Sequence, residues 1–436
     1  MKPVKIGLLG LGTVGGGTAT VLQRNAEEIS RRAGRGIIVD FAATLEIERA
    51  EELGLEGLRL TENAFDVVND PDIDIVVELI GGYSPAKELV LQAIANGKHV
   101  VTANKALIAL HGNEIFAKAQ EKGVMVTFEA AVAGGIPIIK ALREGLSANK
   151  INWIAGIING TGNFILTEMR EKGRAFDDVL AEAQALGYAE KDPTFDVEGI
   201  DAAHKLSILS SLAFGIPLQF EKTYTEGIST ITPEDVEYAD ELGYTIKHLG
   251  IARRTEQGIE QRVHPTLIPK TRLIANVNGV MNAVLIMGDA VGPTLYYGAG
   301  AGDEPTASAV VADIIDIVRV MTSDPNNRVP HLAFQPDQLA DIPVLPLEAI
   351  QTAYYLRVCV LDEPGVLAEI TTILGKSNIS VEAFIQKQPK VGETKVDIIL
   401  LTQRVNEGDM NKALAQIEAL TVTCSHVVKI RVETLK

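Results

Sequence analysis

The sequence predicts an α/β protein in three consecutive parts. These are an N-terminal doubly wound parallel sheet, a middle α+β part and a small C-terminal part with β-α-β-β-α-β order. Three observations support this fold class. Apolar, strand-like runs alternate with helical patterns early in the chain, a glycine-rich turn follows the first run, and a proline-rich stretch precedes a charge-balanced C-terminal segment. A chain of 436 residues is too long for one core, which favours two or three domains.

Composition and charge exclude several classes of function. Hydrophobic residues make up 46% and charged residues 22% of the chain, as in globular proteins. The net charge of −17 argues against nucleic acid or an anionic membrane as a partner. No apolar run approaches the ~20 residues of a membrane span, and the start at Met1 predicts no signal peptide. With only Cys359 and Cys424, a disulfide framework is excluded and a cytoplasmic enzyme is expected.

The first strand-like run, Val4–Leu9, leads into GLGTVG and then into a helical pattern. Strand, G-x-G-x-x-G and helix in this order predict dinucleotide binding in a Rossmann-like domain. Gly10 allows the tight turn, Gly12 lets the backbone approach the pyrophosphate, and Gly15 permits close packing of helix on strand. The N-terminus of the helix then faces the phosphates.

The second strand, Ile37–Ala43, is expected to end near the adenosine ribose. An acidic residue there usually holds the 2′-hydroxyl of NAD, whereas an Arg favours the 2′-phosphate of NADP. The sequence offers Glu46 for the first role and Arg49, a weaker candidate, for the second.

Further elements continue the alternation. A strand is expected over Ile73–Ile80, a helix over Pro85–Ala95 and a strand over His99–Thr102, after which ANK begins a helix. Ligands bind at the carboxyl ends of parallel strands, and Lys105 follows such an end. The alternative is an exposed lysine at a helix start, where a cation is slightly unfavourable.

Three more glycine loops follow. The strand Val124–Phe128 leads into EAAVAGGIP, Glu129–Pro137, whose carbonyl groups could coordinate a hard monovalent cation; the residues alone favour a tight turn. The strand Ile151–Ile158 leads into a polar loop that caps a helix. From Gly298, GAGAGDEP precedes a strongly apolar helix that could return to the cofactor domain.

The stretch LGYAEKDPTFDVEGIDAAHKLSIL, between the second and third of these loops, is the most distinctive. It opens as a loop, with Asp196 as the expected N-cap of a helix that runs to Phe214 and stops at Gly215. Asp201 and Lys205 lie four residues apart on one face of a helix that is apolar nearly all round, so both are expected in the interior. Taken alone, this pair is read as a structural ion pair; the glycine-rich start of the chain favours a catalytic one.

The C-terminal part follows a linker that contains five prolines between Pro325 and Pro346. Residues from Ile350 onward carry equal numbers of acidic and basic side chains. Their pattern predicts a strand, a helix, two strands, a helix and a strand. DEPGVL follows the first of these strands and is expected to leave exposed amide groups near Gly365, with Asn378 close by.

Taken together, GLGTVG, TANKALIA, EAAVAGGIPII, GIINGTGNFIL, LGYAEKDPTFDVEGIDAAHKL and GAGAGDEPTAS resemble the homoserine dehydrogenase family over residues 1 to about 325. The resemblance implies the NADPH- or NADH-dependent reduction of L-aspartate 4-semialdehyde to L-homoserine, in threonine, methionine and isoleucine biosynthesis. The last part looks like an ACT domain, which implies feedback regulation by an amino acid, with threonine as the expected effector. A cytoplasmic homodimer or homotetramer is expected.

By position, the resemblance also assigns roles to residues. The catalytic residues would be Lys205, the proton donor, Lys105, the lysine beside nicotinamide and substrate, and Asp201, which with Glu190 matches the substrate-binding carboxylates. The substrate-binding residues would be Glu190, Asp196, Tyr188 and Thr161. The cofactor-binding residues would be Gly10, Leu11, Gly12, Thr13, Val14, Gly15, Glu46, Arg49, Thr102, Lys105, Gly187 and Gly302. Sodium ligands would be Glu129, Val132, Gly134 and Ile136. The regulatory residues would be Asp362, Gly365, Val366 and Asn378.

One departure concerns the cofactor. Many members of the family have an Arg-Asp pair after the second strand, where this chain has Leu45 and Glu46. Loss of the arginine predicts that NADH is used at least as well as NADPH.

The sequence predicts a dinucleotide-binding domain over residues 1–135, completed by a returning helix near 303–325. A substrate-binding, catalytic and dimerisation domain is expected over 136–302, a linker over 326–349 and the ACT domain over 350–436, which should regulate without catalysing.

Two rival functions were weighed. Oxidation of an aldehyde to an acyl phosphate needs a thiol nucleophile, and no cysteine precedes Cys359. A non-catalytic sensor of dinucleotide and amino acid is the remaining alternative, and the lysine with its carboxylates argues against it.

Overall fold

The computed structural model describes residues 2–54, 57–389 and 394–436 and divides into two compact units. Unit 1 comprises Met1–Gly160, Ala203–Glu221 and Val280–Ile342, and unit 2 comprises Thr161–Ala202, Lys222–Gly279 and Pro343–Lys436. Each unit is therefore assembled from three separate segments of the chain.

Unit 1 contains a parallel sheet with strand order β3-β2-β1-β4-β5-β6 in its described residues. This order reverses direction between β1 and β4, which is where dinucleotides bind in doubly wound sheets. The predicted Rossmann-like fold is thus confirmed. The strands are β1 (Val4–Leu9), β2 (Ile37–Ala43), β3 (Arg59–Thr61), β4 (Ile75–Glu78), β5 (His99–Thr102) and β6 (Val126–Thr127).

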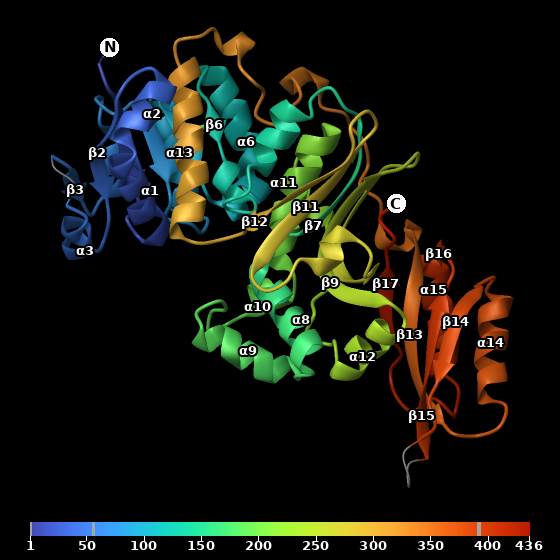
Figure 1. Cartoon of the computed structure of the whole chain (residues 1–436). Helices are drawn as coiled ribbons and strands as arrows, with labels where there is room; N and C mark the ends of the chain where they lie inside the picture. Colours follow the sequence, from blue (N-terminus) through green and yellow to red (C-terminus); the bar gives the residue numbers. More distant parts are fainter. Residues whose placement is uncertain (1, 55–56, 390–393) are drawn as a thin grey trace. The chain divides into compact units, whose positions relative to one another are not determined.

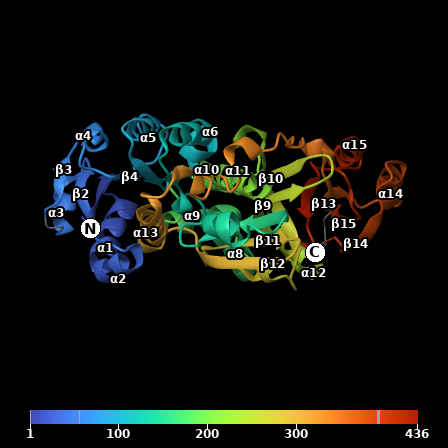
Figure 2. The same cartoon turned by 90° about the horizontal axis from the view of Figure 1, so that it is seen from above.

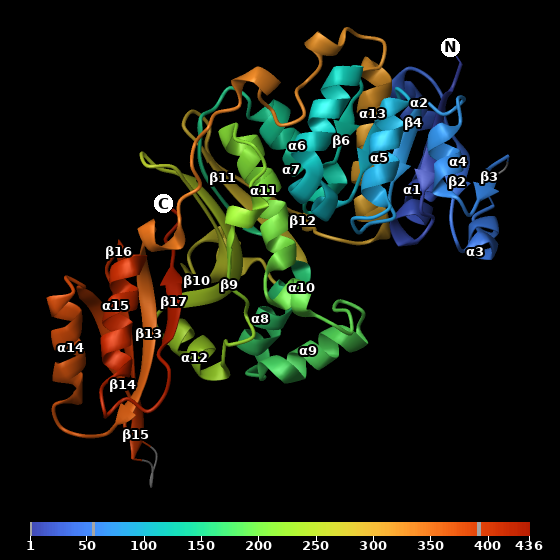
Figure 3. The same ribbon diagram turned by 180° about the vertical axis from the view of Figure 1, so that it is seen from behind.

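Helices cover both faces of this sheet (Figure 2). One face carries α1 (Thr13–Arg24), α2 (Ala26–Ala33) and α13 (Asp303–Val320); the other carries α4 (Ala64–Asn69), α5 (Ala86–Ala95) and α6 (Lys105–Lys122), which are seen in front in Figure 3. The short α3 (Ile47–Glu52) follows β2. Although α13 lies almost three hundred residues after α1, the two helices pack side by side, and Val310 and Ile314 join the core formed with β1 (Figure 1).

The remaining strands of unit 1 form an antiparallel ladder of β7 (Ile151–Ile157), β11 (Met281–Gly288) and β12 (Gly292–Ala299). Between β6 and β7 lie a one-turn 3₁₀ segment (Glu129–Ala131), α7 (Ile138–Lys140) and a π-helical turn (Ala141–Gly145).

The helix that carries Lys205 is α11 (Ile200–Phe214), and its predicted end at Phe214 is confirmed, with Gly215 at φ 65°. Its predicted N-cap is wrong. Asp196 lies inside a separate short helix, α10 (Thr194–Val197), because Gly199 adopts φ 82° and breaks the chain direction before α11 begins.

Unit 2 begins with two helices and ends with a sheet that extends into the C-terminal part. Its helices are α8 (Gly160–Lys172), α9 (Phe176–Ala185), α10 and α12 (Pro233–Glu241), and its first strands are β8 (Tyr224–Thr225), β9 (Tyr244–Arg254) and β10 (Ile259–Pro269). β10 pairs with β9 antiparallel and with β8 parallel.

The C-terminal part has the predicted β-α-β-β-α-β order, with strands arranged β17-β13-β15-β14. Apolar side chains of its two main helices pack on one face of that sheet. The elements are β13 (Gln351–Leu361), α14 (Val366–Lys376), β14 (Val381–Gln386), β15 (Lys395–Thr402), β16 (Val405–Asn406), α15 (Glu407–Glu418) and β17 (Val428–Val432).

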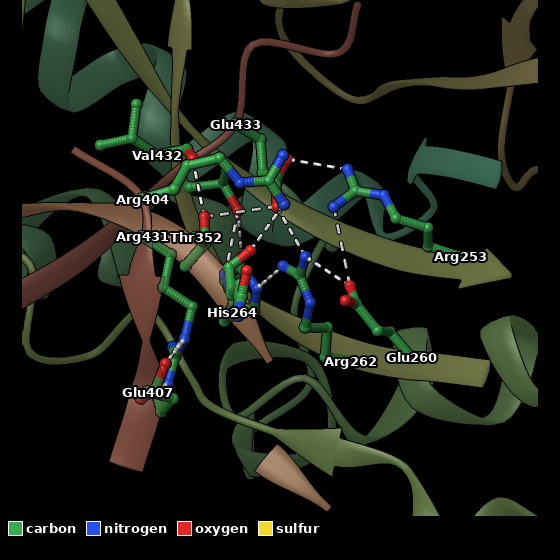
Figure 4. A network of polar contacts seen from close by, with 12 residues as sticks. Arg253, Glu260, Arg262, His264, Thr352, Arg404, Glu407, Arg431, Val432 and Glu433 are labelled. Atoms are coloured by element: carbon green, nitrogen blue, oxygen red, sulfur yellow. Dashed lines mark hydrogen bonds and ion pairs between the residues drawn. The ribbon is translucent and has the colours of Figure 1, made fainter. Parts of the chain in front are cut away.

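This part is built into unit 2. β17 pairs in parallel with β10, with Thr266 opposite Arg431 and Leu267 opposite Val432. Beside this pairing, Glu433 bridges Arg262 at 2.6 Å and Arg253 at 2.9 Å, as Figure 4 shows.

Apolar residues of β13, β15 and β17 also share a core with α8 and β10. A chain cut after Leu347 would therefore leave Arg262 and this core uncovered.

Candidate active site

The turn between β1 and α1 has the backbone shape that a dinucleotide pyrophosphate requires. Gly10 adopts φ 93°, and a Cβ there would lie 3.0 Å from the carbonyl oxygen of Leu79. A Cβ at Gly15 would lie 2.0 Å from the carbonyl oxygen of Gly10, so only glycine permits this packing. Gly12 faces open space instead, which lets a ligand approach the backbone beside the first turn of α1. Thr13 and Val14 form that turn.

A cavity of about 570 Å³ opens at the carboxyl ends of β1, β2 and β4, a volume in the range of small-molecule sites. The predicted cofactor residues in its lining are Gly10, Leu11, Gly12 and Glu46. Glu46 is exposed, directly before α3. These features fit the adenosine half of a dinucleotide. The side chain of Arg49 lies outside the described residues.

The carboxyl ends of β4 and β5 are joined by side chains. The hydroxyl of Thr102 donates to the carboxylate of Glu78 at 2.6 Å and accepts from the backbone N–H of Asn104 at 3.0 Å. Asn104 caps α6 through the N–H of Leu107. Lys105, the first residue of α6, is thereby fixed at the ligand edge of the sheet.

The third glycine loop returns to the cofactor domain. Gly302 adopts φ 124° directly before α13, and a Cβ at Gly17 of α1 would lie 3.1 Å from backbone atoms of Asp303. The same loop touches the predicted cation loop, since a Cβ at Gly134 would lie 2.7 Å from the carbonyl oxygen of Gly300.

Glu129 is buried, and its carboxylate accepts from the N–H groups of Ile139 and Lys140, both at 2.8 Å. Its own N–H donates to Asp313 at 2.7 Å. Burial, with the nearby charge of Asp313, raises the pKa of Glu129 to about 7. Burial likewise raises the pKa of Asp313 to about 6, and Arg143 opposes that rise.

The other predicted sodium ligands are Val132, Gly134 and Ile136, in the loop after Glu129. Val132 and Ile136 are buried, and the carbonyl of Ile136 accepts from the N–H of Ile138. Within residues 2–54, 57–389 and 394–436, no group of three or more His, Cys, Asp or Glu side chains could hold a metal. Any cation here would thus be held mainly by backbone carbonyl oxygens, together with Glu129.

Lys205 and Asp201 are both buried in α11, with 9% and 2% of the residue exposed, so their predicted entry into the interior is confirmed. The Nζ of Lys205 donates to the carbonyl oxygen of Ile158 at 2.8 Å. Ile158 directly follows β7 and precedes the polar loop at Asn159, so this contact holds the ammonium group at a strand end.

In unit 2, the loop between α9 and α10 holds several predicted substrate residues. The hydroxyl of Thr161, near the start of α8, donates to the carbonyl oxygen of Tyr188 at 2.6 Å. The ring of Tyr188 contacts the ring of Phe164, with centroids 5.2 Å apart. Gly187 turns the chain at φ 77°, and Glu190 is exposed two residues after Tyr188.

The predicted effector residues flank α14. Gly365, at φ 99°, is the exposed residue directly before the helix, and Val366 is buried in its first turn. Asp362 is exposed, and its N–H donates to Thr394 at 2.9 Å. Asn378 adopts φ 57° just beyond the C-terminus of α14. Asp362 and Gly365 thus lie at the N-terminal end of α14, and Asn378 at its opposite end.

Two buried groups at these strand and helix ends were not singled out from the sequence. Glu78 lies inside the strand expected over Ile73–Ile80, although a carboxylate that closes a strand at the ligand edge is itself a signal. Lys247 is 1% exposed and donates to Asn163 and to the carbonyl oxygen of Val277. Burial lowers its pKa to about 7. Lys247 lies within β9, in a segment where no sequence pattern indicated chemistry.

Three known families match consecutive parts of the chain. Residues 10–129 match the family described as "Homoserine dehydrogenase, NAD binding domain", and residues 137–315 match "Homoserine dehydrogenase". Residues 354–421 match "ACT domain". No helix in the described part of the chain is both long and apolar enough to cross a membrane.

Similar proteins match over the whole length. The homoserine dehydrogenase of Pseudomonas aeruginosa is 69% identical over 435 residues, which is 100% of both chains. The crystal structure of a homoserine dehydrogenase from Thiobacillus denitrificans has a TM-score of 0.96 and 71% identity, covering 100% of this chain and 99% of that one. A hyperthermophilic archaeal homoserine dehydrogenase in complex with NADPH has a TM-score of 0.63 and 28% identity, covering 74% and 99%. The chain therefore belongs to the homoserine dehydrogenase family of oxidoreductases, and it carries an ACT domain.

Proposed function

We propose that this protein interconverts L-aspartate 4-semialdehyde and L-homoserine with a nicotinamide cofactor. The observation that carries the proposal is Lys205, a buried lysine held by Ile158 at a strand end and placed one helical turn after Asp201. A buried lysine is costly unless it is paired or used.

When bound, the cofactor supplies or accepts the hydride. In the direction of reduction, negative charge develops on the aldehyde oxygen, and the ammonium group of Lys205 stabilises that charge and donates the proton. Asp201 keeps Lys205 charged and oriented. Lys105, at the start of α6, serves as a second cation beside the reacting groups.

The substrate carries an ammonium and a carboxylate group. Glu190 suits the ammonium group because it is an exposed carboxylate on a short loop, and Asp196 would assist it. Thr161 and Tyr188, which are hydrogen-bonded to each other, would set the shape of that loop.

The glycine turn and the first turn of α1 would hold the pyrophosphate. The cofactor residues are those predicted from the sequence, from Gly10 to Gly15 with Glu46, Arg49, Thr102, Lys105, Gly187 and Gly302. Because Glu46 lines the adenosine cavity, we propose that NADH is used at least as well as NADPH.

We also propose a sodium ion at the loop of Glu129, Val132, Gly134 and Ile136. The support is geometric: a buried carboxylate stands beside a loop of buried, small residues that turns its backbone through positive φ at Ala133 and Gly134. A rise in the melting temperature with NaCl, but not with choline chloride, that is lost in Glu129→Gln would support the site.

The ACT domain would bind an amino acid, with threonine as our candidate, and place the enzyme under end-product control in the cytoplasm as a homodimer or homotetramer. The exposed N-terminal end of α14, with Asp362 and Gly365, would receive the zwitterion.

Oxidation of L-homoserine, followed by the appearance of reduced nicotinamide, tests the function directly. Turnover with NAD or NADP, absent in Lys205→Met, would support it. Binding of cofactor and homoserine without turnover would favour the sensor alternative.

A further inference from the structure

Glu78, the last residue of β4, is fully buried and makes three hydrogen bonds. Its Oε1 accepts from the N–H groups of Ile80 and Gly81, both at 3.0 Å. Its Oε2 accepts from the hydroxyl of Thr102 at 2.6 Å. All three partners are neutral donors, so within the described part of the chain the hydrogen bonds that hold this buried carboxylate come from dipoles, an arrangement that is costly for a purely structural brace.

These bonds join two turns at the ligand edge of the sheet. The hydroxyl of Thr102 also accepts from the backbone N–H of Asn104. The side chain of Asn104 donates to the carbonyl oxygen of Gly82 at 2.7 Å and caps α6. The turn after Glu78 is tight, with φ 78° at Gly81 and 71° at Gly82. A change at Glu78 would therefore move both the turn after β4 and the residue that begins α6, Lys105.

The same turn supports the glycine loop. The carbonyl oxygen of Leu79 lies 3.0 Å from where a Cβ on Gly10 would be. Within the adenosine cavity, Glu46 lies after β2, on one side of β1, and the cavity also reaches Leu79 and Ile80, after β4. A dinucleotide that crosses the sheet at β1 and β4 consequently extends its other half, the nicotinamide, towards the ends of β4 and β5.

We propose that Glu78 is a positioning residue for the nicotinamide half of the cofactor, and that its negative charge favours the oxidised form. The proposal rests on the proposed function. The nicotinamide ring is positively charged only when oxidised, so a fixed negative charge beneath its site binds that form more tightly than the reduced form. The Glu78 carboxylate would thus position the nicotinamide half through its hydrogen bonds and distinguish the two cofactor forms through its charge.

Three variants separate geometry from charge. Glu78→Gln removes the charge and replaces one acceptor by a donor. Thr102→Val removes the hydroxyl but keeps the charge. Glu88→Gln makes the same charge change at an exposed position in α5 and serves as the matched control. For each, the dissociation constants of the oxidised and reduced cofactor are measured by calorimetry, and the melting temperature is recorded.

In Glu78→Gln we expect affinity for the oxidised cofactor to fall about tenfold more than affinity for the reduced one, the scale of one charge at moderate distance. Thr102→Val should weaken both forms to a similar degree, and Glu88→Gln neither. In kinetics, Glu78→Gln should raise KM for the oxidised cofactor more than it lowers kcat.

A folded Glu78→Gln protein with an unchanged ratio of the two dissociation constants would overturn the charge role. If its melting temperature falls while both constants stay at the wild-type values, Glu78 is only a structural brace. A wild-type protein that binds both cofactor forms but does not oxidise homoserine would refute the proposed function and leave the Glu78 measurement valid.

Discussion

Arg431, in the last strand of the chain, forms an ion pair of 2.6 Å with Glu226, in the segment that follows β8. The same guanidinium holds both carboxylate oxygens of Glu407, at 2.9 and 2.7 Å. Arg431 therefore joins the N-terminus of α15 in the ACT domain to the chain beside Gly227. A Cβ at Gly227 would lie 2.2 Å from the carboxylate of Glu198, two residues before α11. The ACT domain is thus connected by packed groups to the turn that precedes Asp201.

The first prediction concerns this joint. Arg431→Met removes the main partner of Glu407, which is fully buried. Burial alone would raise the pKa of Glu407, and the guanidinium of Arg431, together with Lys429, holds it at about 2. We expect the free energy of unfolding to fall by about 3 kcal/mol, the lower end of the usual cost of removing one member of a buried ion pair, because Lys429 and Tyr354 still contact Glu407 in the variant. Urea denaturation measures this loss.

The control is Lys412→Met, which breaks an exposed ion pair with Asp409 on α15 and should cost less than about 1 kcal/mol. Equal losses of unfolding free energy in both variants would mean that the buried contacts of Arg431 stabilise the protein no more than an exposed ion pair does.

The second prediction concerns pH. The N–H groups of Met125 and Val126 donate to His99 and His331, at 2.9 and 3.1 Å, so both rings must accept there. Burial, helped by Arg328, lowers the pKa of His99 to about 4. Burial, with Arg143 and Arg328, does the same for His331.

Because both folded-state pKa values lie below the unfolded value of about 6.5, the unfolded chain takes up protons first. The stability that these two rings contribute is fully present above pH 6.5 and is lost as the pH falls towards 4, by up to about 1.4 kcal/mol per pH unit for each ring. The raised pKa values of Glu129 and Asp313 act in the opposite direction over the same range. His331→Gln should remove the share of one ring, so its free energy of unfolding should fall less steeply with decreasing pH than that of the wild type, by about 1.4 kcal/mol per pH unit. Phe116→Leu, which removes the ring stacked on His331, should lower stability without changing the slope. An equal pH dependence in His331→Gln and in the wild type between pH 6.5 and 5 would contradict the assignment.

Local signals in the sequence predicted much of the fold and the site. The Gly10–Gly15 turn, the burial of Lys205 and Asp201 and the C-terminal β-α-β-β-α-β order each depend on short-range patterns, and the structure contains them. The N-cap of α11 was missed because the left-handed turn at Gly199 is a backbone choice that Asp196 does not reveal. The pairing of β17 with β10 could not be predicted either, since it joins strands more than 160 residues apart.

The third prediction concerns the proton donor. Lys205→Met should lower kcat by at least ~10², the scale of a lost general acid, with little change in KM. Lys118→Met, at an exposed position of α6, is the matched control. A kcat within a few-fold of the wild type would show that Lys205 only supports Ile158 and the end of β7.

The fourth prediction concerns the cofactor. Glu46 should accept from a ribose hydroxyl and repel a 2′-phosphate, so kcat/KM for NADH should equal or exceed that for NADPH. Glu46→Ala should shift the preference towards NADPH, whereas Glu62→Ala, at another acidic residue lining the same cavity, should shift it less. A strong preference for NADPH that Glu46→Ala leaves unchanged would instead implicate Arg49.

The fifth prediction concerns the effector. An amino acid at the N-terminal end of α14 would direct its carboxylate to the exposed amides at Gly365 and its ammonium group to Asp362, since a helix N-terminus attracts the anion and a carboxylate the cation. Asp362→Asn removes only the charge, so the threonine concentration for half-inhibition should rise about tenfold, as expected for one charged hydrogen bond. Glu363→Gln makes the same change at the next residue, also exposed, and should leave the response unaltered.

For both variants, inhibition by threonine and the shift of the melting temperature by threonine are measured. Point variants are used instead of a truncated chain because they keep β17 paired with β10. A response equal in both variants would move the effector site away from Asp362. If the full chain shows neither inhibition nor a thermal shift, threonine is not the effector, and other amino acids are to be tested in the same pair of variants.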